Sequence, residues 1–210
     1  MLKNLKVPKS ILYLLGLALI LNILRVFLFG NASFLYILWN IVLAFVPFLI
    51  SLILLLRTNK ENIVKPFFII GFIIWFIFLP NAPYVVTDFI HLGRIHAVPV
   101  MFDIFLLFAS AGVSLLMGLY SISHMEKMLL LKFSKKITNI TIAIVILFTS
   151  FGVYLGRYFR FNSWDFFISH NSLMESIWKI FTESNNYANV YGYTLLFFAF
   201  IYISYVSFRE

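Results

Sequence analysis

Cysteine is absent from the 210 residues, and charged residues are scarce. Without cysteine the chain can form no disulfide, thiolate metal site, iron–sulfur cluster or cysteine nucleophile. Charged side chains make up 11% of the sequence against 62% hydrophobic residues, and the mean hydropathy is +0.98. That composition leaves too few polar residues to cover a water-soluble fold and too many apolar residues for a disordered chain. We therefore expect an integral membrane protein.

Acidic residues are the scarcer charge, since eight Asp and Glu stand against 16 Lys and Arg, which gives a formal net charge of +8. The basic residues occur in short blocks beside apolar segments, so a positive-inside membrane topology explains them better than nucleic-acid binding does. Nucleotide-binding and common hydrolase motifs are also missing: there is no GxGxxG, P-loop, HExxH or GxSxG pattern. We expect membrane lipids as partners and no nucleic acid.

Long apolar runs predict an all-α fold, a polytopic transmembrane helical bundle with about six spans and interfacial helical segments on its outer face. A bilayer core of roughly 30 Å needs about 20 helical residues. The third run should end near Pro80, because the Pro80 to Pro83 stretch cannot continue a regular helix. We expect one membrane domain over 1–210, with spans at approximately 10–29, 35–56, 66–80, 100–122, 137–156 and 188–207.

The distribution of Lys and Arg predicts the orientation of these spans. Placing both termini in the cytoplasm puts 11 of the 16 basic residues on that side: Lys3, Lys6, Lys9, Arg57, Lys60, Lys65, Lys127, Lys132, Lys135, Lys136 and Arg209. The first run has full spanning length and no small-x-small cleavage site, so we expect a first span and not a signal peptide.

Two outer connections are unusual under this topology. The segment 81–99 contains Asp88, His91, Arg94 and His96 among apolar residues, so we expect it to lie in the interface or to dip into the membrane. The segment 157–187 contains a capping box that begins at Ser172. Apolar residues follow it at three- and four-residue spacing, which predicts an amphipathic helix on the outer surface.

Asp88 and His91 are three residues apart and would share one face of a helical turn, which Gly93 could end. A carboxylate beside an imidazole is a minimal general-base pair and also resembles two ligands of a divalent metal. An equally good explanation is that the Asp caps a short turn while the His lies among the headgroups. Asp103, just inside the fourth span, is a candidate second carboxylate.

Arg157 and Arg160 are three residues apart at the outer end of the fifth span, where paired guanidinium groups suit a phosphate or carboxylate. Asn162 or Ser163 then offers an N-cap, with Asp165 in the turn that follows. We take Arg157, Arg160, Asn162, Asp165 and Asn81 as candidate residues for binding a lipid headgroup or a lipid-linked anion.

A structural explanation of these charges stays open. The arginines can extend to the interface and pair with Asp165. More generally, the charged groups at membrane depth can pair with one another to hold helix ends together: Arg25, Arg157, Arg160, Asp88, Asp103 and Asp165. Either way, we expect the segments 81–99 and 157–165 to meet.

Two stretches carry a family resemblance. Phe78 to Tyr84, followed by Thr87-Asp88 and His91-Leu92, and Gly156-Arg157 with Arg160 and Asn162 to Asp165, resemble the signature segments of a bacterial domain-of-unknown-function family of small integral membrane proteins. Leu38-Trp39-Asn40 and the later Pro47 fit the same pattern. The resemblance implies a bacterial inner or plasma membrane and a common polar centre on the outer face, and it implies no reaction.

Our leading functional hypothesis is an outer-face polar site that binds or modifies a lipid or a lipid-linked anionic substrate. Whether the protein is an enzyme stays open. The first alternative is a small transporter or channel, with Asn40, Arg25, Asp103 and the broken third span along its pathway. The second is an accessory subunit of a membrane complex. The inner halves of the spans look almost entirely aliphatic or aromatic, which favours a site on one side.

Overall fold

The computed structural model describes residues 7–61, 63, 65–92, 98–168, 170–182 and 187–209, and every regular element among them is a helix. Six helical segments are long and apolar enough to cross a membrane, so the chain is a multi-pass membrane protein, as its sequence predicts. The elements are α1 (Lys9–Phe29), α2 (Tyr36–Arg57), α3 (Pro66–Phe78), α4 (Asn81–Tyr84), the 3₁₀ helix η1 (Val85–His91), α5 (Val100–Leu129), α6 (Lys135–Tyr158), α7 (Asp165–Ile168), α8 (His170–Thr182) and α9 (Tyr187–Arg209).

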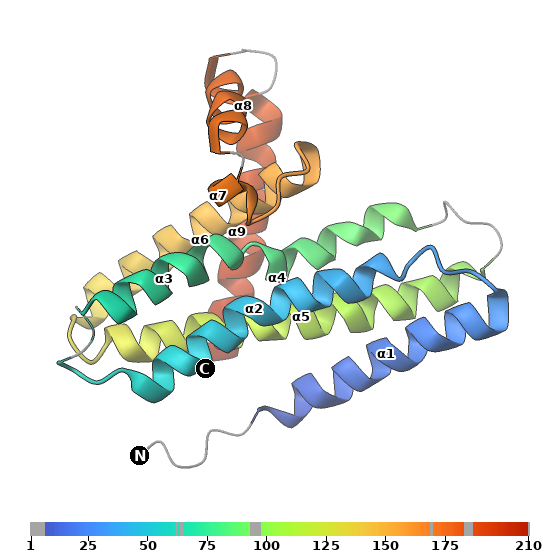
Figure 1. Cartoon of the computed structure of the whole chain (residues 1–210), viewed down its shortest axis with the longest axis horizontal. Coiled ribbons are helices and arrows are strands. Elements are labelled where there is room, and N and C mark those ends of the chain that lie inside the picture. The colour runs from blue at the N-terminus through green and yellow to red at the C-terminus, as the bar shows by residue number, and fades with distance from the viewer. Residues whose placement is uncertain are drawn as a thin grey trace.

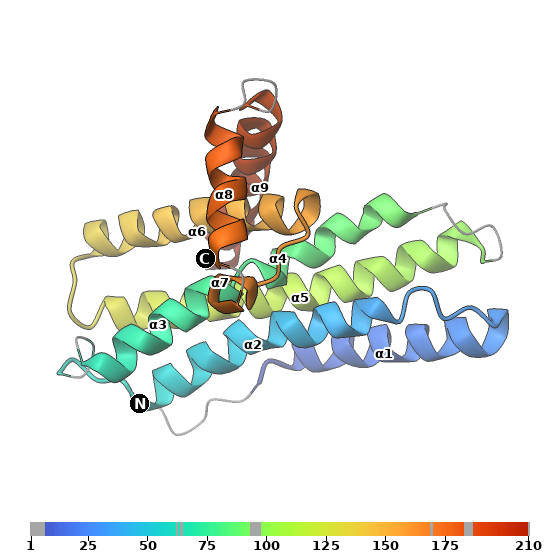
Figure 2. The same cartoon turned by 45° about the horizontal axis from the view of Figure 1, so that its top comes forward.

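Five of the long helices, α1, α2, α3, α5 and α6, run along the long axis of the molecule, and α9 crosses them steeply (Figure 1). Figure 2 shows α8 standing beside α9, away from the bundle. We call the end of the bundle where α1 ends and α2 begins the η1 end, and the opposite end the Arg57 end.

Two apolar cores hold the bundle together. One joins α1, α2 and α5 toward the η1 end, with Ile37, Phe48 and Leu106 buried at its centre. The other joins α2, α3, α5, α6 and α9 toward the Arg57 end around Trp75 and Met125. α5 takes part in both cores, which is why half of its spanning window is buried.

α5 continues to Leu129, beyond the predicted end at residue 122. Polar residues in this last part interrupt the apolar pattern, but the buried ones Ser121, His124 and Glu126 each have a partner on another helix. Ser121 accepts a hydrogen bond from the Trp75 indole at 3.0 Å, and His124 contacts the Ser51 hydroxyl at 3.1 Å. A buried polar group with a partner is compatible with a helix in the membrane, so the helix does not end there.

The third span ends at Phe78, close to the predicted break, and the chain continues as α4 and η1. Segment 81–99, which we expect to lie in the interface or to dip into the membrane, begins as an irregular helical continuation that packs on α2, α5 and α6. Gly93, Arg94 and His96 lie outside the described residues.

The predicted amphipathic helix is α8. It begins at His170, two residues before the predicted capping box, a shift that is usual for helix ends. Ile180 is buried against Val190 of α9, whereas Met174 and Trp178 are exposed. On the polar face Lys179 pairs with Glu175 at 2.7 Å and lowers the pKa of that carboxyl by hydrogen bonding. Glu183 lies outside the described residues.

Candidate functional site

A cavity of about 1230 Å³ lies between α3 with α4 on one side, α6 on another, and α9 with α7 and α8 on the third. Most of its wall is apolar and aromatic, with Phe76, Phe148, Phe151 and Leu195 among the lining residues. Phe148, Leu195 and Ile90 are exposed at its edges, so the cavity opens toward the surroundings of the bundle. Its polar lining residues come from α2, α4, η1, the end of α6, the loop that follows, and α9: Asn40, Asn81, Tyr84, His91, Arg157, Arg160, Asn162, Ser163, Tyr191 and Thr194.

Arg157 forms the centre of the polar cluster. One guanidinium nitrogen lies 3.3 Å from an Asp88 carboxylate oxygen, and Asn40 donates a hydrogen bond to the other Asp88 oxygen at 2.9 Å. Asp88 is 1% exposed, so its charge would be costly without these two partners. The three residues come from α2, η1 and α6, and their contact ties these elements together.

Other contacts fix the direction of the Arg157 side chain. The same nitrogen that meets Asp88 donates to the Thr87 carbonyl oxygen. The guanidinium carbon lies 5.3 Å from the centre of the Tyr84 ring, and its second nitrogen reaches the Tyr84 hydroxyl at 3.4 Å. The buried Nε has no partner among the described residues. Arg157 is therefore a positioned cation that still lines the cavity.

Two glycines in α6 allow this approach. A Cβ atom on Gly152 would lie 2.6 Å from the Pro80 ring, and one on Gly156 would lie 3.2 Å from the Tyr84 ring. Gly152 and Gly156 are four residues apart, and such small-xxx-small spacing lets two membrane helices pack closely. The Pro80 break thus lies against the glycine face of α6, one turn before Arg157.

Asn81 and Ser163 connect the two segments that we expected to meet. The Asn81 amide donates to the Phe78 carbonyl and to the Ser163 hydroxyl, both at 2.8 Å, and Ser163 donates in turn to the Ile77 carbonyl at 2.9 Å. Together with the Arg157–Asp88 pair, these bonds confirm that segments 81–99 and 157–165 are in contact. Ser163 therefore joins α3 to the loop and is not a helix cap.

Arg160 follows the end of α6 and lines the cavity with an exposed side chain. Its φ is +58°, a left-handed conformation that glycine adopts more readily than arginine. Among the described residues Arg160 has no carboxylate partner. Asp165 instead accepts a hydrogen bond from the backbone amide of Asn162 at 2.7 Å, which closes the turn before α7. Asn162 lines the cavity and Asp165 does not.

His91 lines the cavity, and its ring lies 5.9 Å from the ring of Tyr36. Both oxygens of Asp88 are engaged by Asn40 and Arg157, so that carboxylate positions these two side chains. Among the described residues no group of three or more His, Asp or Glu side chains is arranged to hold a metal ion. A metal at Asp88 and His91 would have no third His, Asp or Glu ligand in the described part of the chain.

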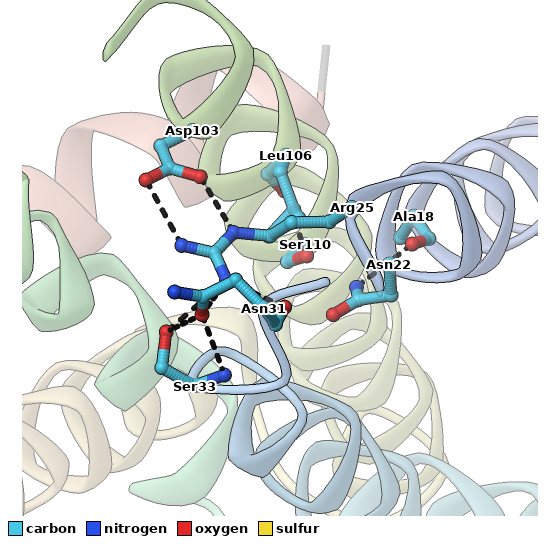
Figure 3. A network of polar contacts seen from close by, with 8 residues as sticks. All are labelled: Ala18, Asn22, Arg25, Asn31, Ser33, Asp103, Leu106 and Ser110. Atoms are coloured by element: carbon cyan, nitrogen blue, oxygen red, sulfur yellow. Dashed lines mark hydrogen bonds and ion pairs between the residues drawn. The ribbon is translucent and has the colours of Figure 1, made fainter. Parts of the chain in front are cut away.

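Asp103 belongs to a different cluster, shown in Figure 3. It binds Arg25 of α1 through both oxygens, at 2.7 and 3.2 Å, and both residues are nearly inaccessible. The remaining Arg25 nitrogen donates to the Asn31 side chain and backbone and to the Ser33 hydroxyl. The structure therefore separates Asp103 from His91, and it satisfies Arg25 internally. The expected pairing of charges at helix ends is confirmed for Arg25 and for Arg157.

A polar cluster toward the Arg57 end does not fit the expectation of almost wholly apolar inner halves. Glu126 of α5 is buried, accepts a hydrogen bond from the Tyr205 hydroxyl and lies 2.6 Å from Arg209. Arg209 also donates to Asn139 of α6 at 3.1 Å. Arg209 is one of the eleven basic residues that predict the topology, and Glu126 is not among the predicted site residues, although a lone carboxylate in an apolar run is a usable signal.

Comparison with known proteins gives one family. No curated protein and no solved structure matches the chain. A family model described as "Protein of unknown function (DUF1361)" matches residues 39–204, which include the cavity walls on α2, α3, α6 and α9 and both segments of the polar cluster. The chain belongs to this family of proteins of unknown function.

Proposed function

We propose that this protein binds an anionic lipid or lipid-linked molecule in the cavity between α3, α6 and α9. The observation that carries the proposal is the division of the cavity wall. Aromatic and aliphatic side chains line most of it, and two arginines, three residues apart at the end of α6, line it as well. A ligand complementary to such a wall has a long apolar part and an anionic headgroup. The cavity volume of about 1230 Å³ exceeds the range of about 300–1,000 Å³ that suits drug-sized ligands.

We propose an orientation for the site from the distribution of the basic residues. With both termini in the cytoplasm, 11 of 16 Lys and Arg lie inside, and the η1 end of the bundle faces outward. The ligand would then be held at the outer leaflet. Together with the resemblance of the motifs to bacterial proteins, this orientation leads us to propose the plasma or inner membrane of a bacterium.

We assign different tasks to the polar residues. Arg160 is the principal anion-binding group because it is exposed in the cavity and has no carboxylate partner among the described residues. Arg157 supports it, with Asp88 and Asn40 fixing its position. Asn81 and Asn162 line the same wall, and Asp165 closes the turn that carries Asn162. If the protein is an enzyme, His91 is our candidate for proton transfer, since Asp88 is engaged by Asn40 and Arg157, and Asp103 pairs with Arg25.

The extent of the cavity favours binding over transport. Its described lining residues on α2 stop at Leu43 and those on α6 start at Leu147. Beyond them the apolar core around Trp75 and Met125 occupies the Arg57 end. A transport pathway needs polar or hydrated passage to the second face, whereas a lipid site needs one opening.

The test is retention of anionic lipid by the purified full-length protein, measured by mass spectrometry at equal protein amounts. Wild type, Arg160→Lys, the double variant Arg157→Ala/Arg160→Ala, and His91→Ala are compared. The matched control is Lys60→Ala/Lys132→Ala, which removes two exposed charges from the Arg57 end. We expect retention to fall about tenfold or more in the double arginine variant and less in Arg160→Lys, because an ammonium cannot form the planar two-donor contact.

His91→Ala and the lysine control should retain anionic lipid as wild type does. Equal retention by all five proteins would overturn the proposal. Loss in the lysine control as large as in the arginine variant would also overturn it, since the effect would then report net charge and not this site. Co-purification of a stoichiometric protein in place of lipid would favour the accessory-subunit alternative.

A further inference from the structure

The cavity wall carries charge of one sign. Its described lining residues include two arginines and no aspartate or glutamate. Asp88, which contacts Arg157, is 1% exposed and has both oxygens bonded, and Asp165 is not among the lining residues. An ammonium group on a ligand would therefore meet two guanidinium groups and find no carboxylate among the described residues that line the cavity.

The Asn81 amide offers a fixed acceptor in the same wall. Both hydrogens on its nitrogen are used, one by the Phe78 carbonyl and one by the Ser163 hydroxyl, whose own proton goes to Ile77. A flipped amide would place its oxygen against the Phe78 carbonyl oxygen, which cannot donate. The amide oxygen is thus held in one place, and no described residue donates a hydrogen bond to it.

Asn40 repeats this arrangement on α2. Its nitrogen donates to the Asp88 carboxylate at 2.9 Å, and because a carboxylate only accepts, the flipped amide would put two oxygens together. Asn40 also lines the cavity. Neither amide oxygen is among the buried unpaired atoms of the described residues, so both stay accessible. The wall therefore combines two cations with two oriented hydrogen-bond acceptors.

We propose that the headgroup held in this site is a phosphodiester that carries hydroxyl groups and no amine. This inference rests on the proposed lipid-binding function and names its ligand class. The arginines donate hydrogen bonds to the phosphate oxygens, and the side-chain oxygens of Asn40 and Asn81 accept hydrogen bonds from hydroxyl groups of the headgroup. Two lipids share this chemistry: a glycerophospholipid with a polyol head, and a polyprenyl phosphate esterified to a sugar.

The experiment compares lipids with identical acyl chains on the purified full chain, by native mass spectrometry. Phosphatidylglycerol has a phosphodiester and two hydroxyls, and phosphatidylethanol has the same phosphodiester and charge without a hydroxyl. Phosphatidylethanolamine and phosphatidylcholine carry an amine or a quaternary ammonium. We expect phosphatidylglycerol to bind about fivefold or more tightly than phosphatidylethanol, the usual effect of a hydrogen bond. Both should bind better than the two zwitterionic lipids.

Two variants test the acceptors. In Asn40→Ala and in Asn81→Ala the preference for phosphatidylglycerol over phosphatidylethanol should shrink by about fivefold, whereas Asn59→Ala, in the connection after α2, should keep it. If one variant fails to fold, the other variant and the comparison of lipids on the wild-type protein still test this inference. Competition between phosphatidylglycerol and a polyprenyl-phosphate hexose then shows which of these two lipids the site prefers. Tighter binding of either one than of phosphatidylethanol supports recognition of a phosphodiester that carries hydroxyl groups.

The result that would overturn this inference differs from the result that would overturn the proposed function. Equal binding of phosphatidylglycerol and phosphatidylethanol, both above phosphatidylcholine, would overturn this inference and leave the proposed function intact. Binding of phosphatidylethanolamine as tight as that of phosphatidylglycerol would also overturn it. If no anionic lipid binds better than phosphatidylcholine, the proposed function itself falls.

Discussion

The substitution Gly152→Ala, which adds one methyl group to α6, tests how closely this helix packs against Pro80. The added Cβ would lie 2.6 Å from Cγ and 3.0 Å from Cβ of Pro80. Carbon atoms in contact prefer about 3.5–4.0 Å, so α4 and α6 must separate by about 1 Å. The Pro80 ring is rigid and cannot rotate away, which leaves movement of the backbone as the response.

That movement has two measurable effects. Overpacking of this kind costs about 1–3 kcal/mol of unfolding free energy, which lowers the melting midpoint of a chain of this size by about 3–10 °C. It also lengthens the Arg157–Asp88 contact, now 3.3 Å, to about 4 Å, beyond hydrogen-bond range. We therefore expect Gly152→Ala to lower both thermal stability and lipid retention.

Gly192→Ala is the matched control, because a Cβ on Gly192 of α9 would meet no heavy atom within 4 Å. Alanine has a helix propensity about 1 kcal/mol better than glycine, so this variant should melt at or slightly above the wild-type temperature. The assay is thermal unfolding of the detergent-purified proteins, followed by intrinsic fluorescence. A Gly152→Ala protein as stable as Gly192→Ala would refute the close packing of α4 on α6.

Two further predictions concern the rest of the bundle. Arg25→Ala or Asp103→Ala should lower the unfolding free energy by about 3–5 kcal/mol, because each leaves an unpaired charge in a buried site. The double variant Arg25→Met/Asp103→Leu should lose much less stability, because no charge remains unpaired. Equal losses of stability in thermal unfolding for the single and double variants would contradict this prediction. If both termini lie in the cytoplasm, Asn171→Cys should react with an impermeant thiol reagent added to intact cells, and Lys60→Cys should not. Labelling of Lys60→Cys without labelling of Asn171→Cys would overturn the orientation.

The positions of the spans could be predicted because hydrophobic length and proline breaks are local properties of a chain. The same is true of the end of α3 near Pro80 and of the amphipathic α8. The end of α5 could not, since Ser121, His124 and Glu126 look like a helix terminus until their partners on other helices are known.

The candidate site was predictable in part for a related reason. The cost of isolated charges at membrane depth indicated that the outer Asp and Arg residues would gather, and Arg157 does meet Asp88. The sequence carries no information on which Asp pairs with which Arg. It therefore could not show that Asp103 pairs with Arg25 and does not belong to the cluster that includes His91. Nor does it show that Asn40, 48 residues from Asp88, would complete the cluster, or that Arg160 would adopt a positive φ.

The Arg25–Asp103 cluster also imposes an order on biosynthesis. Asp103 is made 78 residues after Arg25, which takes about 4–16 s at ordinary rates of translation, and during that time α1 carries a cation without its carboxylate. Asn31 and Ser33 follow Arg25 by only six and eight residues, so they can solvate the guanidinium as soon as the first turn after α1 forms. Ribosome-bound chains cut before residue 103 should accordingly release α1 to alkaline extraction more readily than chains that extend through α5, and Asn31→Ala should increase that release.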